Sequence, residues 1–136
     1  MRTINILAVI ASLLFSININ AQNLIGLNLY QAKQYLQKEG HSVSEFDLEN
    51  GKRKALGYEE EIMVIYYFDY NNICRAYHTY FTKKNRSLAN DKSVFERTLK
   101  NYKKIGDYYY LDNYKAGIFY DDESGYYIRF ADLDYF

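Results

Sequence analysis

The feature that most constrains the fold is the stretch from residue 61 to residue 81, EIMVIYYFDYNNICRAYHTYF. Two runs with period-2 character flank the central 71–72 pair of asparagines, and this pattern predicts a β-hairpin with arms of about ten residues. The arms are long and aromatic. We therefore expect the hairpin to form the centre of an antiparallel sheet.

The register of this hairpin decides which side chains face the core, because a slip of one residue turns every side chain to the other face. If residues 71–72 form a two-residue turn, Asp69 pairs with Cys74 and Ile65 pairs with His78. If a type I turn instead begins at Asp69, with residue 72 in the left-handed conformation, Phe68 pairs with Cys74. The rest of the arm then slips by one residue.

The first register gives the more apolar single face and is preferred. Its inner face would hold Ile62, Val64, Tyr66, Phe68, Ile73, Tyr77 and Phe81. Its outer face would hold Met63, Ile65, Tyr67, Ala76, His78 and Tyr80. This register also turns Arg75 inward, where a buried cation is costly unless it is paired.

The first 21 residues predict a cleaved secretory signal. Arg2 supplies a positive start, a short apolar run extends from Ile6 to Phe15, and Ala21 offers a small residue for cleavage before Gln22. The run is too short to span a bilayer, and no cysteine near the cleavage point would allow lipoprotein attachment. We expect a periplasmic or secreted protein with no membrane insertion after cleavage.

Residues 22–136 predict a single domain. The whole chain has 17 basic and 17 acidic residues, so it lacks the basic surplus that would attract nucleic acid or an anionic membrane. We therefore expect neither as a partner. Its only cysteine, Cys74, cannot form an internal disulfide. The 17 tyrosines must supply much of the core, because their rings bury apolar area while their hydroxyls reach a partner or water.

A first helix is predicted from Asn28 to Gly40. Asn28 is the N-cap, Gln31 completes a capping box, and Gly40 closes the helix. This capping pattern, about fifteen residues long, resembles the helix that opens several small exported bacterial modules. PASTA domains and the two-repeat α+β inhibitors of β-lactamase are examples. The resemblance assigns no family.

The remaining elements complete an α+β pattern. Residues 50–51, Asn-Gly, predict a hairpin in which Asp47 faces Lys54, and this pairing accounts for the basic run at 52–54. A polar linker (82–90) leads to a second helix, expected to end at Gly106. Three strands follow, and a turn with left-handed Gly125 sets the register of the last two.

We therefore predict one two-layer α+β domain with an antiparallel meander sheet of about seven strands and two helices on one face. The helix, glycine, strand and turn layouts of the two halves are alike, which suggests a faint internal α-β repeat.

The sequence predicts no catalytic, cofactor or metal site. Cys74 and His78 are four residues apart on one strand, roughly 13 Å, which is too far for a nucleophile and its base. The two histidines lack the spacing of zinc ligands.

The tyrosine-dense sheet instead predicts an exported, non-enzymatic binding module that engages another protein, as an inhibitor or immunity-type protein would. The expected contact residues are Tyr67, His78, Tyr80, Tyr108, Tyr109, Tyr110 and Tyr114. Carbohydrate or small-ligand binding through exposed tyrosines is the alternative, although the absence of tryptophan counts against it. An uncharacterised enzyme is the third hypothesis.

Overall fold

The structure is a computed structural model and describes residues 21–136. The predicted signal segment lies outside the described residues, apart from Ala21. The elements in chain order are α2 (Leu29–Lys38), β1 (Ser44–Leu48), β2 (Arg53–Glu59), β3 (Ile62–Phe68), β4 (Cys74–Phe81), the 3-10 helix η1 (Lys83–Asn90), α3 (Lys92–Thr98), β5 (Lys103–Ile105), β6 (Tyr108–Leu111), β7 (Tyr114–Asp121) and β8 (Gly125–Asp132).

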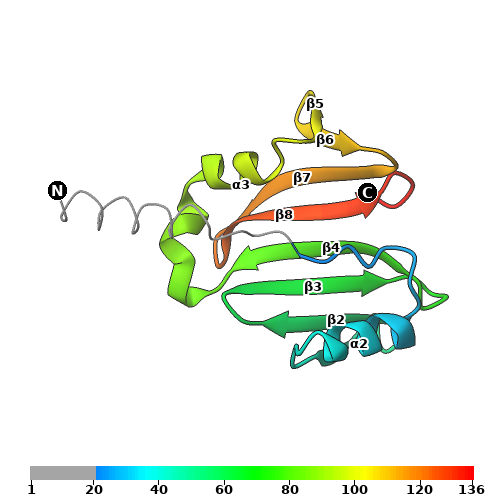
Figure 1. Cartoon of the computed structure of the whole chain (residues 1–136). Coiled ribbons are helices and arrows are strands. Elements are labelled where there is room, and N and C mark those ends of the chain that lie inside the picture. The colour runs from blue at the N-terminus through cyan, green and yellow to red at the C-terminus, as the bar shows by residue number, and fades with distance from the viewer. Residues whose placement is uncertain (1–20) are drawn as a thin grey trace.

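All eight strands belong to one open antiparallel sheet in the order β1-β2-β3-β4-β8-β7-β6-β5 (Figure 1). The α+β class is thus confirmed in outline, with eight strands where about seven were expected. Each helix precedes a four-stranded meander, and the last strands of the two meanders, β4 and β8, pair at the centre of the sheet. The centre is therefore built from residues about fifty positions apart.

The extra strand comes from the second predicted helix, which is much shorter than expected. Asp91 caps α3 through a hydrogen bond from the Ser93 backbone N–H, and the helix ends at Thr98. The prediction that it continues to Gly106 is wrong. Residues 103–105 instead pair with β6 across a turn in which Gly106 has a φ of +63°. Pairing with β6 gives residues 103–105 backbone hydrogen bonds in place of those that a longer helix would supply.

The segment expected to be a linker is also ordered as a helix. Residues 83–90 form η1, and Ala89 is buried against the turn that joins β7 to β8. A Cβ on Gly125 would lie 2.8 Å from the Ala89 side chain, so this contact requires a glycine. The left-handed Gly125 that the sequence predicted is present, with a φ of +76°.

The central hairpin combines the two registers considered from sequence. Next to the turn Phe68 pairs with Cys74, whereas farther along Ile65 pairs with His78. A β-bulge at Arg75 absorbs the difference of one residue. The expectation that Arg75 points into the core is wrong. Its guanidinium forms ion pairs with Asp69, at 2.9 Å, and with Asp132, at 3.3 Å.

The buried core lies on one face of the sheet. Alternate strand residues such as Leu56, Val64, Phe68 and Ile128 form one cluster. The same cluster includes the buried side chains Ala32 and Leu36 of α2 and Phe95 of α3, together with Leu99 just after α3. Tyrosine contributes as expected: Tyr66 is fully buried, and its hydroxyl donates a 2.7 Å hydrogen bond to the carbonyl of Gln22.

Two local predictions are confirmed. The capping box joins Asn28 and Gln31 through reciprocal hydrogen bonds of 2.9 and 3.1 Å. Asp47 pairs with Lys54 across the first hairpin, where their side chains form an ion pair. Within residues 21–136, no helix has the length and apolar character needed to cross a membrane.

Candidate functional site, the open face of the sheet

The side of the sheet opposite the core cluster is called here the open face. The strand register defines its central residues, because side chains alternate between the two faces. They are Met63, Ile65 and Tyr67 of β3, Ala76, His78 and Tyr80 of β4, Tyr127, Arg129 and Ala131 of β8, Lys115, Gly117 and Phe119 of β7, and Tyr108 and Tyr110 of β6. The β3 and β4 residues are those that the sequence predicted.

His78 and Arg129 form the centre of the open face. They are paired opposite each other on β4 and β8, and Arg129 Nη1 donates a hydrogen bond to His78 Nε2 at 2.9 Å. Since Nε2 is the acceptor, the ring proton resides on Nδ1, which donates to the Tyr80 hydroxyl at 2.8 Å. Burial and the neighbouring Arg129 charge lower the pKa of His78 to about 3. The imidazole is thus neutral at physiological pH.

Aromatic rings surround this pair. The Tyr67 and His78 ring centroids are 4.7 Å apart, and the Tyr80 and Tyr127 rings stack at 4.8 Å. These rings are only partly exposed, because they pack side by side across three adjacent strands. Burial raises the pKa of both Tyr67 and Tyr80, so their hydroxyls remain protonated hydrogen-bonding groups. The result is a packed aromatic surface with polar tips.

The centre of the open face carries positive charge without a matching acid. Among the described residues, no ion pair involves Arg129 or Lys115. By contrast, Arg53 and Arg75, near the ends of their strands, are paired with acids. The Lys115 ammonium lies over aromatic rings instead, 4.1 Å from the Tyr108 centroid. The centre is therefore suited to contact an acidic group.

The structure separates the residues that the sequence predicted as contacts. Tyr67, His78, Tyr80, Tyr108 and Tyr110 lie on the open face. Tyr109, which is 7% exposed, and Tyr114 lie on the core side, as the register with Ala116 shows.

Four residues of the site, Tyr127, Arg129, Phe119 and Phe136, were not among the contacts predicted from sequence. The predicted β7–β8 turn already implied that Tyr127 and Arg129 lie on the face opposite Ile128, and the observed register agrees. What the sequence did not reveal is the pairing of β4 with β8, which brings Arg129 beside His78.

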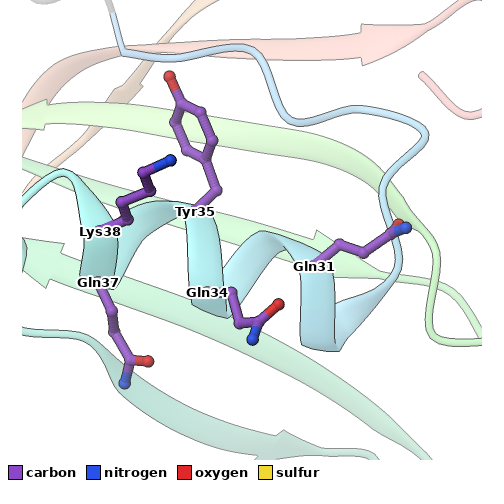
Figure 2. Close-up of a pocket in the computed structure, with 5 residues that line it drawn as sticks. All are labelled: Gln31, Gln34, Tyr35, Gln37 and Lys38. Atoms are coloured by element: carbon purple, nitrogen blue, oxygen red, sulfur yellow. The ribbon is translucent and has the colours of Figure 1, made fainter.

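Other candidate sites have fewer features that point to a ligand. An open depression beside α2 is lined by Gln31, Gln34, Tyr35, Gln37 and Lys38 (Figure 2). All five side chains come from one helix and spread apart along it, so they do not converge on a ligand. In the part of the chain that the structure describes, no three His, Cys, Asp or Glu residues gather as metal ligands.

Cys74 lies in the core on the opposite side of the sheet from His78. It is fully buried, and burial raises the pKa of its thiol to about 12. A buried, protonated thiol is a poor nucleophile.

Comparisons of the chain with protein-family models, with curated proteins and with solved structures find no match.

Proposed function

We propose that this protein is an exported, non-enzymatic binding module whose open face docks another protein. The observation that carries the proposal is the composition of that face: a half-buried cluster of tyrosines around Arg129, whose charge has no acidic partner among the described residues. Tyrosine and arginine are enriched at protein interfaces and at their binding hot spots. Scattered apolar residues would not form such a continuous surface.

The size of the sheet supports a protein as the partner. Eight strands about 4.8 Å apart give a surface about 34 Å wide. A standard protein interface buries about 800 Å² on each partner, which a surface of this width can supply. We take the domain to be two-layered, with both helices on the core face, so that no helix covers the open face.

Charge complementarity defines the partner further. Within residues 21–136 neither Arg129 nor Lys115 of this face forms an ion pair, so the partner contributes a carboxylate that reaches these two cations. A secreted enzyme held by an inhibitor, or a toxin held by an immunity protein, would suit this arrangement.

Export is part of the proposal. Cleavage after Ala21 would leave Gln22 as the first residue, and the Gln22 carbonyl already accepts the hydrogen bond from Tyr66. Mass spectrometry of exported protein should find a chain that begins at Gln22. An exported chain that retains Met1 would contradict cleavage.

Quantitative capture tests the docking face. Immobilised wild-type protein and the Tyr67→Ala, Tyr80→Ala double variant are exposed to periplasmic and secreted proteins of the source cells. The control is a Tyr30→Ala, Tyr120→Ala double variant, which truncates two tyrosines that are 69% and 57% exposed and lie off the open face. We expect at least a tenfold loss of one captured protein from the first variant and none from the control. Equal capture by a folded Tyr67→Ala, Tyr80→Ala variant would overturn the proposal.

A further inference from the structure

The last four residues of the chain, 133–136, fold back over the open face after β8. The segment is defined here as the tail. The backbone N–H of Tyr135 donates to the Asp132 carbonyl at 3.1 Å, which turns the chain back on itself. Arg53 of β2 then donates to the Tyr135 hydroxyl at 2.7 Å, and Arg129 donates to the Tyr135 carbonyl at 3.3 Å. The tail thus covers part of the proposed docking surface.

The tail ends in a built recess, defined here as the Gly117 notch. A Cβ on Gly117 would lie 2.9 Å from the Phe136 ring and 2.8 Å from the Phe119 ring. The missing side chain therefore makes the space that the Phe136 ring fills. The Tyr108 ring meets the Phe136 ring edge-on, with centroids 5.2 Å apart.

Two cations complete the notch. The Lys115 ammonium is 4.5 Å from the centroid of the Phe136 ring, and the Arg129 guanidinium carbon is 5.8 Å from it. Both distances allow cation–π attraction. These are the same two cations that lack acids on the open face. The notch thus has the shape to hold an aromatic ring, and its two cations would attract an acidic residue close to that ring.

We infer that the Gly117 notch is the aromatic subsite of the docking face, and that the partner inserts an aromatic side chain there in place of Phe136. This inference rests on the proposed function. The partner segment carries a carboxylate close to the aromatic residue; in the tail, Asp134 stands two positions before Phe136. The tail is a weak occupant held in place by its covalent attachment, which gives it a local concentration in the millimolar range.

Displacement of the tail is feasible because few hydrogen bonds hold it. Within the described residues, four hydrogen bonds join the tail to the rest of the chain. The Leu133 N–H donates to the Asn113 carbonyl and the Tyr135 N–H donates to the Asp132 carbonyl, each at 3.1 Å, and the two arginines donate to Tyr135. Segments with so few contacts open at a small fraction of the global unfolding free energy.

Nuclear magnetic resonance of the full-length Phe136→Ala variant tests the notch. The probe is an acetylated Leu-Asp-Tyr-Phe peptide, and the matched control is Leu-Asp-Tyr-Ala. We expect saturable shifts of the Gly117 and Lys115 amide signals with the first peptide only. Wild-type protein should require at least tenfold more peptide, because its own Phe136 competes.

A second protein variant checks that the peptide binds in the notch. Gly117→Val in the Phe136→Ala background fills the recess and should abolish the shifts. If that variant unfolds, Tyr108→Ala in the same background removes one wall and should weaken binding several-fold. The inference is overturned if folded Phe136→Ala protein shows no saturable shifts. It is also overturned if neither Gly117→Val nor Tyr108→Ala, in that background, weakens peptide binding. Such a failure leaves the docking proposal intact, since capture by the open face is measured independently of the peptide.

Discussion

Arg129 and His78 are joined by a 2.9 Å hydrogen bond across the seam where the two four-stranded meanders meet. Four strands lie on either side of this contact. Because a neutral histidine accepts this bond, it leaves the positive charge of Arg129 without compensation in the middle of an aromatic surface. The proposed docking of an acidic partner depends on this uncompensated charge.

The pH dependence of stability should report the buried state of His78. Its folded pKa is lowered to about 3, below the unfolded value of about 6.5. The unfolded chain therefore binds a proton that the folded chain does not, and stability falls as pH drops from about 6.5 towards 3. The contribution of this one group has a slope of at most about 1.4 kcal/mol per pH unit.

Urea unfolding of wild-type protein and His78→Gln at pH 7, 5.5 and 4.5 measures this slope. The variant should lose less stability than wild type over that range. Arg129→Gln should also flatten the curve, because the charge of Arg129 helps to lower the pKa of His78. Parallel curves for wild type and His78→Gln would contradict the assignment.

Cys74 should resist thiol reagents in the folded protein. The side chain is fully buried and burial raises its pKa to about 12, so neither access nor thiolate is available. A chromogenic disulfide reagent should label one thiol in denaturant and almost none in native buffer. Fast labelling of the native protein would show that the core face opens near Cys74.

Local features of the structure could be predicted from sequence because they depend on neighbouring residues. The Asn28–Gln31 capping box is set by residues within one helical turn, and the Asp47–Lys54 pair is set by the short hairpin turn between the two residues. Alternation along β3 and β4 likewise placed Tyr67 and Tyr80 on the open face. These signals gave most of the first half of the fold.

Long-range features could not be predicted in this way. The ion pair between Arg75 and Asp132 joins residues that are 57 positions apart, so the hairpin sequence alone does not reveal it. The strand at 103–105 forms because β6 offers it a partner, against the local preference for helix. The candidate site also depends on residues far apart in the sequence, since Arg129 lies beside His78 only because β4 and β8 pair.

Site-specific photo-crosslinking tests the central claim, that the open face docks a protein, most directly. A photoreactive amino acid replaces Ile65 or Tyr110 on the open face, or Tyr30 or Lys38 on the exposed side of α2, in protein exported by its own cells. If the open face docks a partner, both open-face positions should crosslink one and the same protein, and neither α2 position should. Crosslinks of that protein to α2, with none to the open face, would contradict docking through the open face.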